Sequence, residues 1–457
     1  MQENKVLDIK LAPYTAGRFT ALNPMWGIDD ENAATSGLFI SPEGGGRPME
    51  GAVPLYPFEY TGWQEEEKSW HDNCYIHSGL NPFPFFTVKG EQFIDLLNAS
   101  CVSTFNNFPV GKARHTIVCD PDGKVMLDGI VVRRAQDEFI CMCMLPALLE
   151  QMCGKKFDIE VTDDSNNMFF YQLCGPRSLE VVEQAAQEDL HDIEFMWLRD
   201  ARIAGKDVFI LRTGMAGTLG YEVHGKTEDA LEVYAALMEA GKPYDIHELG
   251  RHAYRNTHTE GSIPQGGIHF SWGGPLTTPV VVGSAGKDCP YLHASPVDLG
   301  WEKMVSLKHD FPGKEAIQKE LEGHHNTLVH LIWDPTDILK VAATWFEKDG
   351  EPCDLMPLAE DFSPTWSSAQ LHLDEVYDGD KLIGATSGRM WSPKNKEMMS
   401  LSIIDQDYAV EGKVVEVLWG NPGTRQMRIK ATVMLTPYIK ECRNDSLDVE
   451  TIPHPVF

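Results

Sequence analysis

A hairpin signal in the first third of the chain constrains the fold more than any other feature. HTIVCD (115–120) and VMLDGIVV (125–132) are two apolar, β-prone stretches, and Pro121-Asp122-Gly123 stands between them. Pro, Asp and Gly in this arrangement favour a tight turn, and a tight turn between two such stretches joins antiparallel strands. We therefore expect an antiparallel sheet in this part of the chain.

Stretches of helical periodicity surround this hairpin. PFFTVK (84–89) is typical of a strand, and the patterns predict helices over Glu91–Ala99, from Gly175-Pro176 to about Ala186, and from an N-cap at Thr227 to Gly241. Strands and helices alternate without a strict βαβ order, so the predicted fold class is α+β.

The length of 457 residues exceeds what one compact domain usually holds, about 250–300 residues. Residues 1–50 end in a Gly- and Pro-rich stretch and are expected to form an irregular extension. In the last third, the turn Asn421-Pro422-Gly423 separates two β-prone stretches, and helical periodicity is sparse. We predict a main α+β domain over 51–328 and a separate β-barrel or sandwich over 329–457.

Composition excludes some partners. The formal net charge is −29, so the phosphates of a nucleic acid would be repelled. The longest apolar run, near Phe139–Leu149, contains Pro146 and is too short to cross a bilayer, and the first ten residues lack the apolar stretch of a signal peptide. We expect a cytoplasmic protein without nucleic acid or membrane partners. The sequence does not decide whether the protein forms a homo-oligomer.

Generic motifs do not identify a chemistry. The ten cysteines include no Cys-x-x-Cys pair, which favours buried thiols over disulfides or a zinc site. A GxGxxG turn after a strand, a phosphate-binding GxxxxGK[ST] loop, a GxSxG elbow and an HExxH helix are all missing from the sequence.

Seven longer segments carry more information because they occur in a fixed order. They are DPDGKVMLDGIVV (120–132), YQLCGPRSLEVV (171–182), RTGMAGTLGYEVHG (212–225), GRHAYRNTHTEGSIP (250–264), LKHDFPGKEAI (307–317), TSGRMWSP (386–393) and VEVLWGNPGTR (415–425). Together they resemble the glycine-cleavage T-protein, or aminomethyltransferase, superfamily over about residues 51–440. Within it, the sequence is most similar to the tetrahydrofolate-dependent O-demethylases of vanillate and 3-O-methylgallate. The resemblance implies a folate-binding body of two intertwined α+β subdomains, a C-terminal β-barrel, tetrahydrofolate as cosubstrate and no metal.

The resemblance assigns roles to two carboxylates. Glu222, in GYEVHG, matches the residue that pairs with the amine and amide edge of the pterin ring, and a sheltered carboxylate accepts two such N–H bonds strongly. Asp128, in LDGIVV, matches the acidic residue that faces the reacting centre, where it would stabilise positive charge near folate N-5. The local sequence alone allows a surface carboxylate at a strand end for Glu222 and a turn residue for Asp128.

Tyr254 stands where the glycine-cleavage branch carries arginine and the demethylase branch carries tyrosine. The resemblance implies that its hydroxyl orients or protonates the phenolate leaving group, the alternative being an aromatic that packs at the helix start. Gln172 and Phe195 match positions that line the folate or substrate pocket, where they would hydrogen-bond and stack on the pterin. Tyr56, in PLYPFEY, matches a second active-site tyrosine.

The sequence departs from the demethylase pattern on the substrate side. Met144, in CMCMLP, stands where vanillate-type enzymes carry an arginine for the substrate carboxylate, and methionine cannot form that ion pair. Ser262 replaces a tryptophan, and IHSGLNPFP after Trp70 diverges. We place Met142, Met144 and His258 on the substrate side, although a lone histidine is more often a structural hydrogen-bonding residue.

These observations predict a methyltransferase that moves a methyl group from a small methoxylated aromatic compound to tetrahydrofolate, giving a phenol and 5-methyltetrahydrofolate. Three alternatives stay open: a sulfonium or other small-molecule demethylase, an aminomethyltransferase of glycine cleavage, and a folate-binding protein without turnover.

Overall fold

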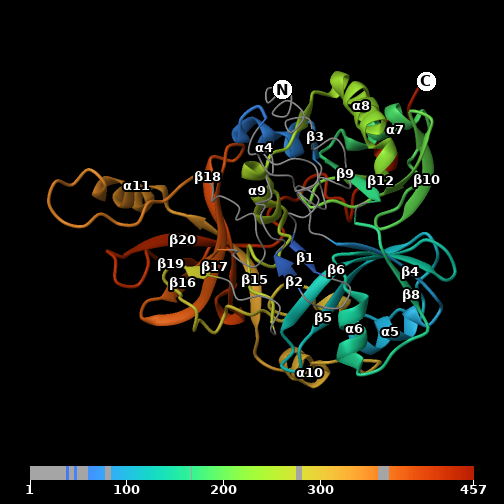
Figure 1. Cartoon of the computed structure of the whole chain (residues 1–457). Coiled ribbons are helices and arrows are strands. Elements are labelled where there is room, and N and C mark those ends of the chain that lie inside the picture. Colours follow the sequence, from blue (N-terminus) through green and yellow to red (C-terminus); the bar gives the residue numbers. More distant parts are fainter. Residues whose placement is uncertain are drawn as a thin grey trace.

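The computed structural model describes residues 60–77, 84–165, 167–273, 280–358 and 370–457, and two short strands before them. These residues form a body of two α+β subdomains with a C-terminal β-barrel beside it (Figure 1). The two short strands, β1 (Leu38–Ile40) and β2 (Gly46–Pro48), pair antiparallel inside the segment that we expected to be irregular. The rest of residues 1–50 lies outside the described residues.

The first subdomain is built on a six-stranded sheet. Its order is β10-β11-β12-β9-β3-β13, with β3 (Cys74–His77), β9 (Met168–Cys174), β10 (Leu198–Ile203), β11 (Lys206–Leu211), β12 (Gly220–Lys226) and β13 (Ile246–Glu248). The helices α7 (Ser178–Ala186) and α8 (Ala230–Gly241) contribute to the same core and confirm the two predicted helices. The N-cap prediction for Thr227 is wrong, because a 3₁₀ turn over Thr227–Asp229 precedes α8 and no side chain caps the helix.

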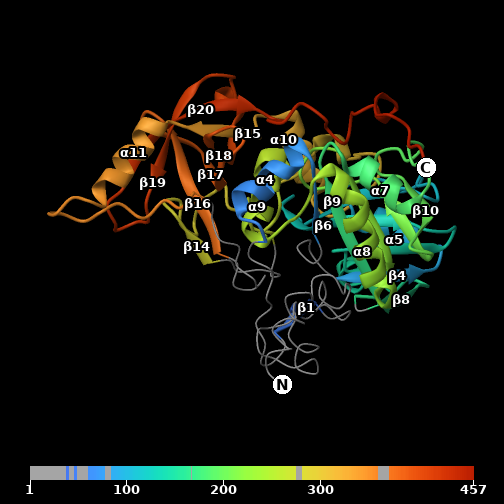
Figure 2. The same cartoon turned by 90° about the horizontal axis from the view of Figure 1, so that it is seen from above.

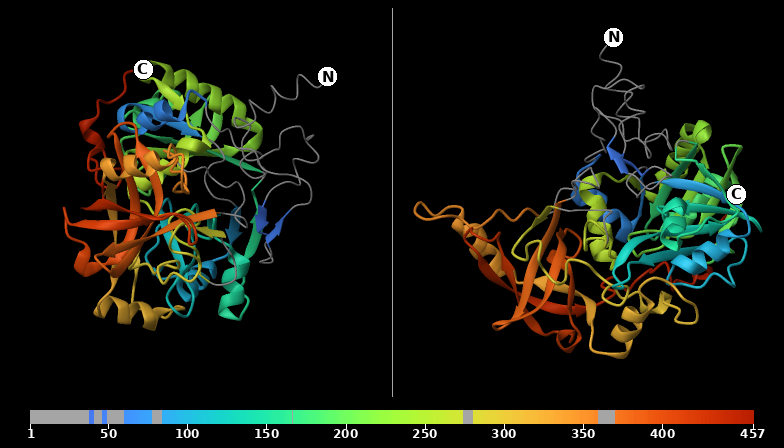
Figure 3. Two further views of the ribbon diagram at one scale, coloured as in Figure 1. Left: turned by 90° about the vertical axis from the view of Figure 1, so that its left-hand side faces the viewer. Right: turned by 60° about the horizontal axis from the view of Figure 1, so that its bottom comes forward.

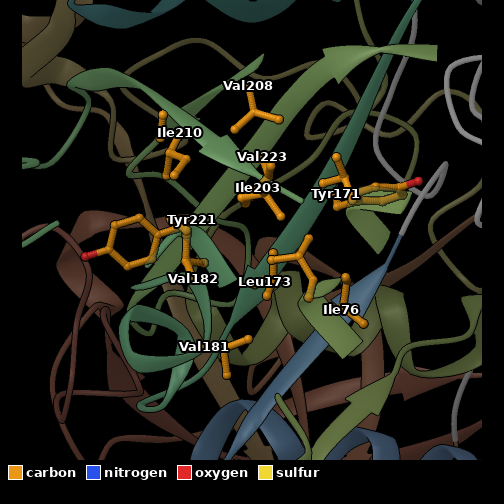
Figure 4. Close-up of a cluster of buried hydrophobic side chains, with 14 of the residues drawn as sticks. Ile76, Tyr171, Leu173, Val181, Val182, Ile203, Val208, Ile210, Tyr221 and Val223 are labelled. Atoms are coloured by element: carbon orange, nitrogen blue, oxygen red, sulfur yellow. The ribbon is translucent and has the colours of Figure 1, made fainter. Parts of the chain in front are cut away.

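The side chains of this sheet alternate between its two faces. Tyr171 and Leu173 of β9 and Tyr221 and Val223 of β12 lie in one buried apolar cluster with α7 and α8 (Figure 4). Successive side chains of a strand point to opposite faces. The intervening residues therefore face the second subdomain.

The second subdomain is a five-stranded antiparallel sheet in the order β5-β6-β7-β4-β8. Its elements are β4 (Phe85–Lys89), α5 (Phe93–Ser100), β5 (Ala113–Cys119), β6 (Val125–Arg133), β7 (Glu138–Met142), α6 (Pro146–Cys153) and β8 (Glu160–Asp163). The predicted strand, helix and hairpin are confirmed, and Gly123 adopts a φ of +80° in the hairpin turn. Because the whole sheet is inserted between β3 and β9, the two subdomains are intertwined.

The C-terminal strands close into a six-stranded barrel. Its order is β16 (Gln370–Asp378), β17 (Lys381–Ser392), β18 (Glu397–Asp405), β15 (Asn326–Trp333), β20 (Met427–Leu435) and β19 (Val414–Trp419), and pairing of β19 with β16 completes the ring (Figure 3). β14 (Val280–Val282) adds to β16 in parallel. The predicted hairpin is confirmed as β19 and β20. In α11 (Pro335–Thr344), the Asp334 side chain caps the backbone N–H of Asp337.

Helices and the C-terminal segment lie between the body and the barrel or connect them along the chain. α4 (Trp63–Asp72) and α9 (Arg251–Gly261) lie side by side between them, and α10 (Lys314–Glu322) precedes β15 (Figure 2). After β20 the chain returns to the body, where the Arg212 guanidinium donates to the carbonyls of Asn444 and Leu447. No helix in the described ranges is long and apolar enough to cross a membrane.

Candidate active site

A cavity of about 830 Å³ lies between the two sheets of the body. Both sheets, the loop after α9 and the C-terminal segment contribute to its wall. Cavities of this size hold ligands as large as typical cofactors. Most of the wall is apolar, with aromatic and sulfur-containing side chains that include Phe85, Met142, Phe170, Phe195, Met196, Trp272 and Trp301.

One carboxylate, Glu222, stands in this apolar wall almost fully buried, with 3% of its surface exposed. It lies on β12 directly opposite Gln172 of β9, and the Gln172 amide donates to Oε1 over 3.0 Å. His224, two residues further along β12, lies 3.1 Å from Oε2 through Nε2. A buried carboxylate needs such donors, because an unsatisfied charge in an apolar wall is costly.

Gln172 connects Glu222 to a second group of side chains. Its carbonyl oxygen accepts from the Tyr75 hydroxyl over 3.0 Å, and His77 Nε2 lies 3.3 Å away. Since that oxygen can only accept, Nε2 of His77 carries the proton and Nδ1 is an acceptor. Nδ1 is buried and has no hydrogen-bond partner among the described residues.

Tyr254 lies behind this connection, on α9. The ring is fully buried and is flanked edge-on by His77 at 5.5 Å and by His258 at 5.0 Å between ring centroids. His258 Nδ1 donates to the Ile263 carbonyl, which leaves Nε2 as a second acceptor without a partner in the described part of the chain. Burial lowers the pKa of His77 to about 3 and that of His258 to about 4, so both rings are neutral near pH 7.

Asp128 is the second carboxylate of the cavity. It lies on β6, and its oxygens contact two ring nitrogens, His115 Nε2 at 3.1 Å and Trp272 Nε1 at 3.2 Å. The next residue, Gly129, is constrained by the neighbouring strand: a Cβ there would lie 2.3 Å from the Met142 carbonyl oxygen. The close packing of β6 on β7 thus holds Asp128 at the cavity wall.

Four cationic side chains line the same cavity although the chain is strongly acidic. They are Lys112, Arg114, Lys303 and Arg443. All four are half-buried or exposed, whereas Glu222 is buried, so the cations stand nearer to solvent than the carboxylate. The cavity therefore offers a buried acceptor, flat apolar walls and outer positive charge.

Comparison with known proteins decides the family. The chain is 37% identical over 429 residues to the sesamin methylene transferase of Sinomonas sp. (strain No.22), covering 88% of this chain and 94% of that protein. The chain belongs to the glycine-cleavage T-protein superfamily. The GCVT N-terminal domain family matches residues 56–269.

A second relative and a solved structure support the same assignment to the superfamily. The syringate O-demethylase of Sphingobium sp. (strain NBRC 103272 / SYK-6) is 29% identical over 434 residues, covering 86% of this chain and 92% of that protein. The glycine cleavage system aminomethyltransferase T from Bartonella henselae has the same fold, with a TM-score of 0.60 at 16% identity over 84% of this chain and 92% of that one. Members of the superfamily are folate-dependent methyl and aminomethyl transferases, and the family binds tetrahydrofolate.

The cavity fits that cosubstrate. Tetrahydrofolate has a pterin ring with an N–H edge, a flat aromatic linker and a glutamate tail with two carboxylates. Glu222 is a buried acceptor of the kind that the N–H edge requires, Phe170 and Phe195 offer flat apolar surface, and the outer cations are opposite in charge to the tail.

The structure brings some of the predicted site residues together. Asp128, Glu222, Phe195 and Met142 line the cavity, and Gln172 contacts Glu222. Tyr254 and His258 lie behind the wall, linked to Glu222 through His77 and Gln172. Tyr56 lies outside the described residues.

Met144 requires a correction. Strand alternation would put it on the same face as Met142, but Cys143 adopts a φ of +61° and interrupts the strand. Cys143 lines the cavity as a result, and Met144 is fully buried in the apolar core with α5 and α6. Its side chain does not line the cavity.

Several residues of the site were missed from the sequence. His224 and His77 complete the hydrogen-bond chain, and His115 and Trp272 hold Asp128. His224 could have been found, because it lies two residues after Glu222 and so shares its face of the strand. His115 lies in the same predicted hairpin as Asp128, 13 residues before it, whereas His77 and Trp272 are far in sequence from the residues that they contact.

Histidine and carboxylate groups that could hold a metal ion also occur outside this cavity. Within the described ranges they are Asp189 with His191 and His454, and His324 with Asp405 and Asp407. None of these residues lines the cavity, so we assign them no part in the site.

Proposed function

We propose that the protein is a tetrahydrofolate-dependent O-demethylase of a methoxylated aromatic compound. The methyl carbon leaves the aryl ether oxygen and bonds to N-5 of tetrahydrofolate, while the N-5 proton is given up and the aryl oxygen gains a proton. The products are 5-methyltetrahydrofolate and a phenol, and no oxidant or reductant is consumed. The observation that carries the proposal is the buried Glu222 carboxylate, held by two neighbours in an apolar cavity of suitable size.

Each residue has a distinct part in this reaction. Glu222 binds the pterin edge and fixes the ring in the cavity. Asp128 stabilises positive charge that develops near N-5 as the methyl group moves. Tyr254 does not line the cavity and lies behind Glu222, Gln172 and His77, so its part is to position these side chains, not to contact the leaving oxygen. Close positioning of the two reactants supplies much of the rate enhancement.

A methylene transfer is the second candidate, and one observation favours it: a protein 37% identical to this chain is named a methylene transferase. A methylenedioxy carbon would leave both aryl oxygens and bond to N-5 and N-10 of tetrahydrofolate, whose two protons would end on the oxygens. That reaction also balances without an oxidant, and it gives a catechol and 5,10-methylenetetrahydrofolate.

Mass spectrometry of the folate product separates these reactions. The protein is incubated anaerobically with tetrahydrofolate and one donor at a time, from methoxyphenols, methoxybenzoates, methylenedioxybenzenes, sulfonium compounds and an aminomethylated lipoyl protein. 5-Methyltetrahydrofolate from a methoxyarene supports the first candidate, and 5,10-methylenetetrahydrofolate from a methylenedioxybenzene supports the second. Product from the lipoyl or sulfonium donor alone, or tight folate binding without product from any donor, contradicts both.

A further inference from the structure

We infer that His224 is the positioning residue that orients the Glu222 carboxylate for the pterin ring. The inference rests on the proposed function, since it concerns the folate end of the same site. It starts from one hydrogen bond, between His224 Nε2 and Glu222 Oε2 at 3.1 Å. The carboxylate can only accept when ionised, so Nε2 carries the proton and donates.

The His224 ring is held by the two neighbouring strands. It stands directly opposite Phe209 of β11 and Phe170 of β9. The Phe209 ring is parallel to it within 3° at a centroid distance of 4.5 Å, and the Phe170 ring is inclined by 20° at 5.6 Å. A ring confined by aromatic faces on both sides delivers its N–H in one fixed direction.

A second hydrogen bond, from the neighbouring strand β9, holds the other carboxylate oxygen. Gln172 stands opposite Glu222, and its amide donates to Oε1. One donor on each oxygen fixes the plane of the carboxylate.

Loss of the His224 donor would weaken folate binding, because the Glu222 carboxylate would be free to rotate and two parallel N–H bonds require a fixed plane. The buried carboxylate would also lose one of the donors that compensate its burial.

His224 lies between two cavities. Glu222 lines the cavity of the candidate active site, whereas His224 lines a second cavity of about 640 Å³. The second cavity is bounded by residues of both sheets, including Arg134, Glu138 and Lys226. Nδ1 of His224 is buried and has no partner among the described residues. In a variant without the ring, the vacated space would adjoin the second cavity, so a small solute would be able to enter it without crossing the folate site.

The first experiment compares tetrahydrofolate affinities by tryptophan fluorescence under anaerobic conditions. His224→Phe keeps an aromatic ring between Phe209 and Phe170 but removes the donor, and we expect a roughly tenfold weaker affinity, as for one hydrogen bond to a charged group. His224→Gln restores an N–H donor and should bind within about threefold of the wild type. His247→Phe, on β13 and outside both cavities, is the matched control and should bind as the wild type does.

The second experiment is chemical rescue, and it decides the matter even if His224→Phe fails to fold. His224→Ala removes the ring, and imidazole added at tens of millimolar is expected to restore several-fold of the lost affinity through the second cavity. A wild type that does not bind tetrahydrofolate would overturn the proposed function itself. Wild-type affinity in His224→Phe, together with weak binding by Glu222→Gln, would overturn only the role of His224. An Ala variant that imidazole leaves unchanged would overturn access through the second cavity.

Discussion

Hydrogen bonds and ring contacts link Glu222 to Tyr254, and the two ends of this side-chain network are built in different ways. The carboxylate end consists of Glu222, Gln172 and His224, and all three lie on two paired strands of one sheet. The aromatic end consists of Tyr254, His258 and His77, and it joins one helix to the end of β3. The first end holds an ionisable carboxylate with a donor for each oxygen, whereas the second holds neutral imidazoles with unused acceptors.

This difference corresponds to the two reactants of the proposed reaction. Strand register leaves little freedom, because a slip of one residue would turn Glu222 away from the cavity. Such a frame suits a ligand that is the same throughout the superfamily. A helix face beside a strand end can change residue by residue, which suits a donor that differs from one member to the next.

The largest expected effect is at the carboxylate end. Glu222→Ala removes an acceptor for two N–H groups, and the dissociation constant of tetrahydrofolate should rise about 100-fold. Fluorescence titration measures it, with Glu160→Ala on the exposed strand β8 as the control. Equal affinities in the two variants would mean that the pterin binds elsewhere.

The next largest effect is at the aromatic end, and it distinguishes catalysis from folate binding. Tyr254→Phe should lower kcat about 30-fold with the affinity for tetrahydrofolate unchanged, because a residue that positions groups for the aryl donor acts only in the chemical step. Single-turnover formation of the folate product measures this, and Tyr377→Phe in the barrel is the control. An equal loss of folate affinity would show that Tyr254 contributes to folate binding, as the carboxylate end does.

Asp128→Asn tests whether charge, rather than hydrogen bonding, matters beside the reacting centre. The amide keeps the size of the side chain and an acceptor for Trp272, and we expect a decrease in kcat of about tenfold from the lost negative charge. The same single-turnover assay measures it. An unchanged rate would reduce Asp128 to a structural partner of His115 and Trp272.

The smallest effect concerns the neutral imidazoles. Folding holds the pKa of His258 at about 4, below the value of roughly 6.5 in an unfolded chain, so the unfolded chain takes up protons first as the pH falls. The stability that is present above pH 6.5 is therefore lost as the pH falls towards 4. Between pH 7 and 6, the wild type should lose about 0.7 kcal/mol more of its unfolding free energy than His258→Gln. Urea unfolding at the two values measures the difference, and equal losses would show that folding does not lower the pKa of His258.

Local patterns predicted much of the fold because turns and periodicity are local properties. The hairpin around Gly123 and the hairpin of β19 and β20 both formed as expected, and so did α5, α7 and α8 within a few residues. The superfamily resemblance added what local patterns could not, the intertwining of the two subdomains and the closure of the barrel.

The candidate site was predictable only in part. Glu222 and Gln172 were chosen from the resemblance, and their strands proved to be paired in register. Met144 was assigned to the substrate side from its match to an arginine position, and the left-handed backbone of Cys143, which turns Met144 into the core, leaves no mark in the sequence. The contact of His77 with Tyr254 depends on packing between segments 177 residues apart, which periodicity does not encode.

The return of the chain from the barrel to the body affects the order in which the site is made. Arg443 and Asn444 line the cavity, and Val449 is part of the core of the first subdomain, yet all three follow the barrel in the sequence. During synthesis on the ribosome, the body therefore cannot complete its fold until the residues that follow the barrel have emerged. A chain that ended before those residues would have a body with an incomplete cavity wall and core, so the body depends on residues that are encoded after the barrel.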